Sequence, residues 1–345
     1  MLRVPRRAGA LLVGLALAAA ACSSAQGSPS SKTTLRLGYF PNITHATAVV
    51  GVATGIFARD LGPNAMFEAK TFNAGPAAVE ALLSGAIDAT YIGPNPAINA
   101  FVRSHGQAVR IISGATSGGA FFVVRPNVMT AADLKGKKVA SPSVGNTQDV
   151  ALRAWLSSHG LKTTTEGGGD VLVVNQENSQ TLETFQSGQI AGAWVPEPWA
   201  TRLVVQGGGK VLVDERELWP AGKYVTTQLV VATEFLRKHP AVVEALLRGH
   251  VEANAFVNEH PSEAQHVVND QIGRLTSKKL SVDVISKAWA NLTFTNDPIA
   301  SSLARTAASA KSLGFLPSAR ITGIYGLALL NKVLKATGRP EIVLP

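Results

Sequence analysis

Polar residues and glycines collect in the turns that precede three predicted helices. These residues are Asn42, Thr44, His45, Asn73, Gly75, Ser143, Gly145, Asn146 and Thr147. Side chains of this kind commonly cap helices, which is one explanation for them. Helix N-termini also present unpaired N–H groups and a partial positive charge, which suit an oxyanion. No lysine or arginine lies within these turns, so the pattern predicts either simple capping or a site for a small, weakly hydrated anion.

Other chemistry is poorly supported by the residue types. The seven histidines form no HExxH motif and no pair spaced three or four residues apart, and Cys22 is the one cysteine. No GxSxG elbow is present, and the glycine runs 167–169 and 207–209 lack the strand-to-helix setting of a phosphate loop. We therefore expect no metal, no cofactor and no enzymatic activity.

An internal repeat indicates what positions the polar turns. Residues 78–97 recur as residues 181–200 at a constant offset of 103, which places Glu80 on Glu183 and Ile87 on Ile190. Each copy reads as a helix, a Ser-Gly stop, a short apolar strand and a proline-containing turn. Two such copies predict two α/β lobes with a cleft between them, because ligands of α/β sheets bind beyond the carboxyl ends of the strands.

The order of apolar segments supports this α/β class. Strands are predicted at 34–39, 67–72, 89–92, 109–113 and 121–124, then at 171–174, 211–213 and 226–233, with helices between them. This alternation predicts a mostly parallel sheet in each lobe, flanked by helices. We expect lobe 1 to comprise residues 34–124 and 229–345, and lobe 2 to comprise residues 125–228.

The N-terminus indicates where the protein works. Residues 1–21 read as a signal peptide, and Cys22 then follows a small-residue stretch that resembles a lipoprotein cleavage box. We predict lipidation of Cys22, a flexible tether over residues 22–33 and an extracytoplasmic monomer anchored to the cell membrane. An ordinary secretory signal is the alternative. The net charge is +9, but lysines and arginines are scattered, which argues against a nucleic-acid partner.

Several motifs together resemble the substrate-binding proteins of ABC transporters, and nearest the nitrate/sulfonate/taurine-type family. The motifs are 72–75 (FNAG), 80–88 (EALLSGAID), 133–140 (DLKGKKVA), 193–200 (AWVPEPWA) and 224–227 (YVTT). The resemblance implies a two-lobe type II periplasmic-binding fold. It also implies an ABC permease as partner and a small anion or zwitterion, of the aliphatic sulfonate, taurine or nitrate class, as ligand.

The same resemblance implies further ligand-binding residues. The ligand loops of the family match residues 39–45, 73–75, 93–95, 141–147, 196–198 and 226–227 of this chain. They add Tyr39, Gly93, Asn95, Glu197 and Thr227 to the candidates from the polar turns. Glu197 has two open explanations: it pairs with the ammonium of a zwitterion such as taurine, or it is a structural carboxylate at a helix start.

Two alternatives differ in ligand or in class. A thiamine-pyrimidine precursor on the same fold would stack on Tyr39 or Trp194. An enzyme on this scaffold would need a nucleophile or a cofactor-bearing cysteine, and Cys22 lies on the predicted tether.

Overall fold

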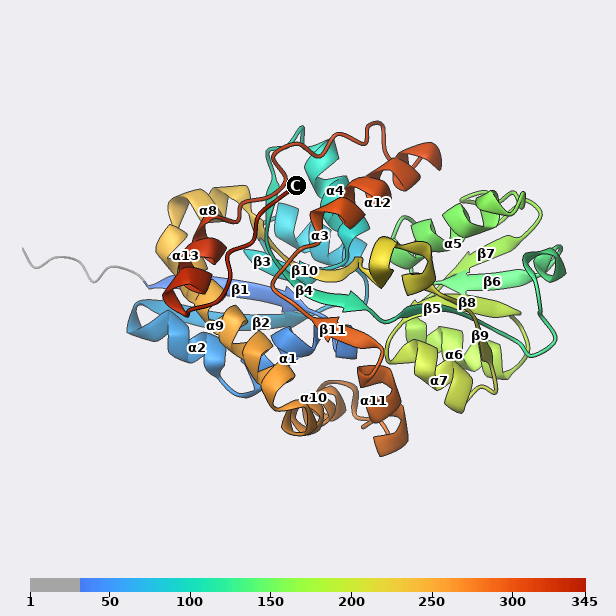
Figure 1. Ribbon diagram of the computed structural model, residues 1–345, viewed down its shortest axis with the longest axis horizontal. Coiled ribbons are helices and arrows are strands. Elements are labelled where there is room, and N and C mark those ends of the chain that lie inside the picture. The colour runs from blue at the N-terminus through green and yellow to red at the C-terminus, as the bar shows by residue number, and fades with distance from the viewer. Residues whose placement is uncertain (1–31) are drawn as a thin grey trace, which may run out of the picture. The chain divides into compact units, whose positions relative to one another are not determined.

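The computed structural model describes residues 32–345. The predicted signal peptide, Cys22 and the tether as far as residue 31 therefore lie outside the described residues. The remaining chain contains two β-sheets with helices on both faces of each, which confirms the predicted α/β class (Figure 1). Across the described helices, none combines the length and the apolar character that a membrane span requires.

The larger sheet has six strands in the order β11-β4-β10-β3-β1-β2. Its strands are β1 (Thr33–Tyr39), β2 (Ala65–Thr71), β3 (Ala89–Ile92), β4 (Val109–Gly118), β10 (Val225–Ala232) and β11 (Leu292–Phe294). β1 is parallel to β2 and β3, whereas β10 is antiparallel to β3 and β4, and β11 is antiparallel to β4. The carboxyl ends of β1, β2 and β3 therefore meet at one edge of this sheet.

The smaller sheet has five strands in the order β7-β6-β8-β5-β9. Its strands are β5 (Ala120–Val124), β6 (Lys138–Ser141), β7 (Leu172–Asn175), β8 (Gly192–Pro196) and β9 (Lys210–Asp214). β6 is parallel to β7 and β8, and β5 is antiparallel to β8 and β9. In the large sheet β10 and β11 run opposite to the other four strands, and in the small sheet β5 runs opposite to the other four. Both sheets are therefore mixed, and the expectation of mostly parallel sheets holds for the shared direction of most strands but not for most of the strand pairs.

Helices cover both faces of each sheet, so alternate residues of a strand enter different cores. In β10, Leu229 packs with one core and Val230 with the other. On the first face of the large sheet lie α1 (Ala46–Ala53), α2 (Ile56–Leu61), α8 (Thr233–Lys238), α9 (Pro240–Glu259), α10 (Pro261–Thr276), α11 (Val282–Trp289) and α13 (Ala328–Ala336). On its second face lie α3 (Gly75–Leu83), α4 (Pro94–Arg103) and α12 (Ala300–Ser312).

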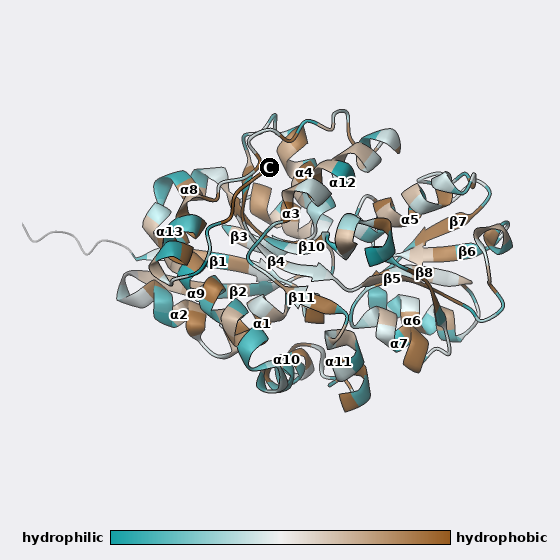
Figure 2. Cartoon of the chain, in the orientation of Figure 1, coloured by the Kyte–Doolittle hydropathy of each residue, from teal (hydrophilic) through white to brown (hydrophobic). Residues whose placement is uncertain are grey.

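The small sheet is covered in the same way. α5 (Thr147–Ser158) packs on one face, and α6 (Asn178–Gln186) and α7 (Trp199–Val205) pack on the other. Because both faces are buried, the strands themselves are rich in apolar residues. Figure 2 shows hydrophobic residues along β5 and β7.

The sequence repeat corresponds to equivalent elements of the two sheets. α3 and α6 begin and end 103 residues apart, and β3 and β8 begin 103 residues apart. The two copies belong to different sheets, and β1, β2 and β3 are ordered as β6, β7 and β8 are. The repeat therefore describes two similar half-structures within the described chain.

The borders between the sheets differ from the expected lobe borders at two places. The strand at residues 121–124 was expected in lobe 1, but β5 pairs with β8 and β9 of the small sheet. The chain changes sheets before it, at Gly118 and Gly119, whose positive φ values of 80° and 72° favour glycine. Likewise β10 joins the large sheet from Val225, before the expected border at residue 229.

Candidate ligand-binding site

A small cavity of about 30 Å³ lies where strand ends of the two sheets meet. The turns after β1, β2, β3, β6 and β7 line it, together with the end of β8 and the start of β10. Its lining residues are Phe40, Asn42, Thr44, His45, Asn73, Gly93, Pro142, Asn146, Thr147, Gln148, Asn178, Pro196, Thr226 and Thr227. This is the position at which α/β sheets bind ligands.

The small cavity is polar but has no charged side chain in its lining. Hydroxyl, amide and imidazole groups supply its hydrogen-bonding capacity. Two of its buried polar atoms, Thr147 Oγ1 and Asn178 Oδ1, have no hydrogen-bond partner within residues 32–345. The volume of the small cavity exceeds the roughly 10–15 Å³ that one water molecule needs. It is far below the ~300 Å³ of the smallest pockets that bind drug-sized ligands. The space therefore suits a group of a few non-hydrogen atoms.

The N-terminus of α5 forms one wall of this cavity. Asn146 is the N-cap residue, and its Oδ1 accepts a hydrogen bond of 2.9 Å from the Thr147 N–H. The preceding turn is fixed because the Gly145 N–H donates to the buried carboxylate of Asp149 at 2.9 Å. Helical N-termini leave further N–H groups without acceptors, so this wall offers donors and a partial positive charge without a cation.

His45 forms part of the opposite wall and is neutral. Its ring is buried, stacks on Phe40 with 4.4 Å between ring centroids, and accepts a 3.3 Å hydrogen bond from the Phe40 N–H at Nδ1. Burial lowers the pKa of His45 to about 3. Because Nδ1 accepts a hydrogen bond, the neutral ring carries its proton on Nε2 and is a donor there.

Direct hydrogen bonds join the two sides of the site. Trp199 Nε1 donates to Asn42 Oδ1 at 3.1 Å, and Asn73 Nδ2 donates to Glu177 Oε1 at 3.1 Å. The Gly93 backbone also approaches the Thr147 side chain closely, because a Cβ on Gly93 would lie 2.4 Å from Thr147 Oγ1. The turn after β3 and the start of α5 are therefore in contact beside the small cavity.

The structure brings eight of the predicted site residues together and places five elsewhere. The eight that line the small cavity are Asn42, Thr44, His45, Asn73, Gly93, Asn146, Thr147 and Thr227. Gly75 begins α3 and lies near Pro96 and Asn146, and Ser143 accepts the Asn146 N–H through its carbonyl. Tyr39 is in the core, and its hydroxyl lies 3.5 Å from Gln271 Nε2.

Glu197 is buried away from the small cavity. Its carboxylate accepts hydrogen bonds from the Thr201 N–H at 3.0 Å, from the Thr201 hydroxyl at 2.8 Å and from Asn291 Nδ2 at 2.7 Å. Burial raises its pKa, and these hydrogen bonds oppose the rise. The contacts favour the structural explanation of this residue, as a carboxylate that holds the start of α7 and ties it to Asn291.

Sequence reasoning placed four further lining residues inside the predicted ligand loops without singling them out as candidates, namely Phe40, Pro142, Pro196 and Thr226. It missed Gln148 and Asn178, which lie outside every predicted loop. The repeat contained a signal for Asn178 and Pro196. At the offset of 103, Gly75 corresponds to Asn178 and Gly93 corresponds to Pro196. Applying the offset to every candidate would have predicted both.

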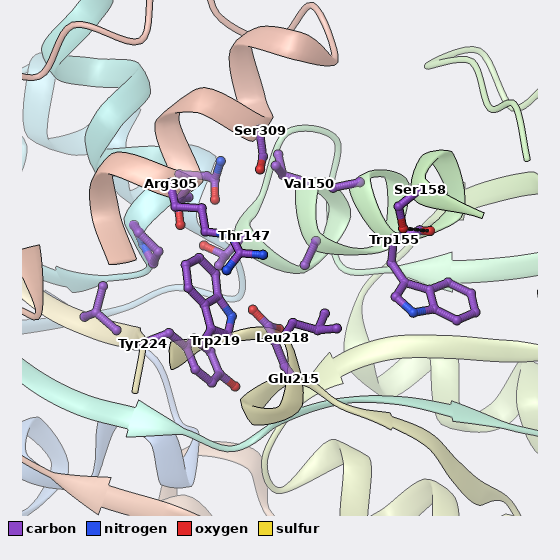
Figure 3. A pocket seen from close by; sticks show the side chains of 16 residues that line it. Thr147, Val150, Trp155, Ser158, Glu215, Leu218, Trp219, Tyr224, Arg305 and Ser309 are labelled. Atoms are coloured by element: carbon purple, nitrogen blue, oxygen red, sulfur yellow. Dashed lines mark hydrogen bonds between the residues drawn. The ribbon is translucent and has the colours of Figure 1, made fainter. Parts of the chain in front are cut away.

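A second, larger cavity of about 250 Å³ lies beside the first and shares Thr147 with it. Asn95, the remaining predicted site residue, lines this larger cavity. Figure 3 shows Trp219 and Tyr224 on one side of it and Trp155 on the other. Trp194, a stacking surface in the pyrimidine alternative, is fully buried in the core of the small sheet and lines neither cavity.

One carboxylic acid and one guanidinium face the large cavity. Glu215 is buried and accepts a 2.8 Å hydrogen bond from Trp194 Nε1. Burial raises the pKa of Glu215 to about 7, against the effect of this hydrogen bond. The Arg305 guanidinium lies 5.0 Å from the ring centroid of Trp219, which in turn stacks on Tyr224.

Comparisons with known proteins agree on one family and one fold. The sequence profile of the NMT1-like family matches residues 28–270. The chain is 29% identical over 206 residues to the taurine-binding periplasmic protein of Escherichia coli (strain K12), covering 60% of this chain and 61% of that protein. It is 27% identical over 195 residues to the putative aliphatic sulfonates-binding protein of the same strain, covering 56% of this chain and 58% of that protein. The matches thus span about three fifths of these relatives.

Solved structures extend the similarity in fold over most of the chain. The alkanesulfonate-binding protein SsuA from Xanthomonas axonopodis pv. citri, bound to MOPS, has a TM-score of 0.71 at 18% identity, covering 87% of this chain and 100% of that one. The periplasmic nitrate-binding protein NrtA from Synechocystis PCC 6803 has a TM-score of 0.71 at 17% identity, covering 89% of each chain.

Proposed function

We propose that this chain, which belongs to the NMT1-like family, is the substrate-binding component of an ABC importer. It captures a small oxyanion of the sulfonate, taurine or nitrate class between its two sheets and delivers it to a permease. The observation that carries this proposal is the small cavity, which is rich in donors, free of charged side chains and placed at strand ends of both sheets. The names of the taurine-binding and sulfonate-binding relatives support the same ligand class.

The proposed binding mode uses neutral donors. The oxygens of the anion accept hydrogen bonds from the Thr147 hydroxyl, the Nε2–H of His45 and the hydroxyl of Thr227. Each hydrogen bond to a charged group contributes about 1.5–3 kcal/mol. Because no cation neutralises the anion, the ligand can leave when the two sheets separate. Binding without a fixed counter-charge therefore suits a protein that must release its ligand.

Opening and closing are proposed to occur between two lobes, each built on one sheet. The two connections between the sheets, at Gly118–Gly119 and at residues 215–224, would act as the hinge. The contacts of Trp199 with Asn42, and of Asn73 with Glu177, would break on opening. The described structure would then correspond to the closed form, which explains why the small cavity is so confined.

We extend the proposal to location and partners. Lipidation of Cys22 would hold the protein as a monomer at the outer surface of the cell membrane, close to its permease. The protein would bind its ligand without converting it, so the ligand should be recovered unchanged.

A ligand screen tests the proposed function. Thermal unfolding would be followed with taurine, alkanesulfonates, nitrate, sulfate, bicarbonate and a hydroxymethylpyrimidine, because a ligand that binds the native state raises the melting temperature. We expect a rise with one or more oxyanions and recovery of that ligand intact. A rise with the pyrimidine alone, or chemical conversion of a bound oxyanion, would overturn the proposal.

A further inference from the structure

The large cavity is suitably placed to continue a ligand whose oxyanion occupies the small one. Thr147 lines both cavities, and the turn after β3 lies between them, with Gly93 at the small cavity and Asn95 at the large one. Thr147 Oγ1 and Asn95 Oδ1 are buried, and neither has a hydrogen-bond partner within the described chain. Thr147 Oγ1 therefore remains available to a ligand at the junction of the two cavities, and Asn95 Oδ1 remains available to a ligand in the large cavity.

The walls of the large cavity have the chemistry of a pocket for a ring. Val150, Ala151 and Ala154 of α5 supply an aliphatic surface, and Trp155, Trp219 and Tyr224 supply aromatic surface. Pockets for organic groups combine such surfaces with a few polar atoms. The contrast with the uncharged polar lining of the small cavity suggests that the two spaces receive different parts of one molecule.

The size of the large cavity sets the size of the group. Its volume is about 250 Å³. For comparison, an apolar protein cavity of roughly 150 Å³ is known to bind benzene. One six-membered ring with a small substituent or linker therefore fits, whereas a methyl or aminoethyl group would leave most of the space unfilled.

The charged groups at the large cavity argue against placing a second anion there. The buried carboxyl of Glu215 faces the cavity. A carboxylate or sulfonate near it would be repelled whenever Glu215 is ionised. Arg305 is partly engaged with the face of Trp219, at 5.0 Å from the ring centroid. The arrangement thus favours a neutral group in the large cavity and a single negative charge in the small one.

We infer that the ligand is a monoanionic oxyanion, such as a sulfonate, that carries one apolar ring, with the anion in the small cavity and the ring in the large one. This inference rests on the proposed function and specifies its ligand class. It separates this chain's preferred ligand from nitrate and from short alkanesulfonates, which would occupy the small cavity alone.

Two probes that share a head group test this assignment. Isothermal titration calorimetry of the whole protein would compare methanesulfonate with phenylmethanesulfonate. Burying the ring is expected to make the second probe bind roughly tenfold more tightly, or more. Ala154→Phe fills the large cavity and should abolish this preference while leaving methanesulfonate affinity unchanged. Ser157→Phe, on an exposed position of the same helix, is the matched control and should change neither affinity.

The outcomes separate this inference from the proposed function. Equal affinities of the wild-type protein for the two probes would overturn the ring assignment and leave the proposed function standing. An equal loss of affinity for both probes in a folded Ala154→Phe variant would place the anion itself in the large cavity. This result would also overturn the assignment. Absence of binding by every oxyanion in the screen would overturn both. The wild-type comparison decides the matter even if Ala154→Phe does not fold.

Discussion

The two neighbouring cavities differ in the charged and titratable groups of their linings. The small cavity holds its polar groups neutral, with His45 deprotonated by burial and no carboxylate, lysine or arginine in its lining. The large cavity keeps a titratable carboxylic acid, Glu215, and a guanidinium, Arg305, beside aromatic rings. If the proposed function is correct, the comparison teaches that a site for an anion need not contain a cation. Oriented N–H and O–H dipoles would then stabilise the charge, and the charged residues would lie beside the organic part of the ligand.

The largest expected effect concerns Glu215 and the stability of the fold. Its pKa is raised from 4.5 to about 7, so the folded protein holds this proton more tightly than the unfolded chain does. Stability should therefore fall as the pH rises from about 4.5 to about 7, by roughly 3 kcal/mol in total from this group.

Replacing the acid isolates this contribution. Glu215→Gln removes the titration, so the free energy of unfolding of the variant, relative to that of the wild-type protein, should increase by roughly 2–3 kcal/mol between pH 5 and pH 8. Urea denaturation of both proteins across that range measures the difference. Parallel profiles would show that Glu215 titrates normally, which would remove one side of the comparison between the cavities.

Thr147 should give the largest effect on binding, because it belongs to both cavities. Thr147→Val keeps the shape and removes the hydroxyl donor, at an expected cost of about 1.5–3 kcal/mol in binding free energy. Affinity for methanesulfonate should fall roughly 10- to 150-fold in calorimetric titrations. Thr147→Ser keeps the hydroxyl and should stay close to the wild-type affinity. An unchanged affinity in Thr147→Val would mean that the hydroxyl does not contact the anion.

Gly93 tests whether the contact between the two sides of the site matters. A methyl group at this position would lie 2.4 Å from Thr147 Oγ1, so Gly93→Ala must displace Thr147 or hold the two sides apart. Overpacking of this kind costs about 1–3 kcal/mol, and we expect a matching loss of affinity. Gly326→Ala is the control, since its added Cβ would lie 3.5 Å from the nearest atom. Equal affinities in the two variants would argue against a tight closed form.

The smallest expected effect is the absence of a pH dependence at the small cavity. With the pKa of His45 at about 3, the imidazole is neutral throughout pH 6–8. Methanesulfonate affinity, measured by calorimetry at pH 6, 7 and 8, should therefore stay constant. An affinity that falls steadily as the pH rises would mean that His45 binds the anion as an imidazolium, and the claim of a neutral cavity would be wrong.

Local signals in the sequence predicted much of this arrangement. The offset of 103 predicted equivalent elements, and α3 and α6 obey it at both ends. Polar residues before helix starts predicted Thr44, Asn146 and Thr147 at the small cavity, because capping chemistry depends on the nearest residues in the chain. These features need no knowledge of tertiary packing.

The features that could not be predicted from the sequence depend on contacts between residues far apart in the chain. Apolar residues 121–124 indicate a strand, but they do not indicate which sheet will accept it, and β5 pairs with the small sheet. Glu197 is explained by Asn291, a partner 94 positions away. The large cavity combines α5, the turns around Trp219 and the Arg305 region of α12, and no spacing in the sequence relates these segments.

The central claim is that the small cavity selects a small anion through neutral donors, and one pair of isosteric ligands tests it most directly. Methanesulfonate and dimethyl sulfone have similar shapes but differ by one negative charge. The account predicts that calorimetric titration of the whole protein gives one molecule of methanesulfonate bound per chain and no measurable binding of dimethyl sulfone. Binding of the neutral sulfone with equal affinity, or a failure of methanesulfonate and every other oxyanion to bind, would contradict it.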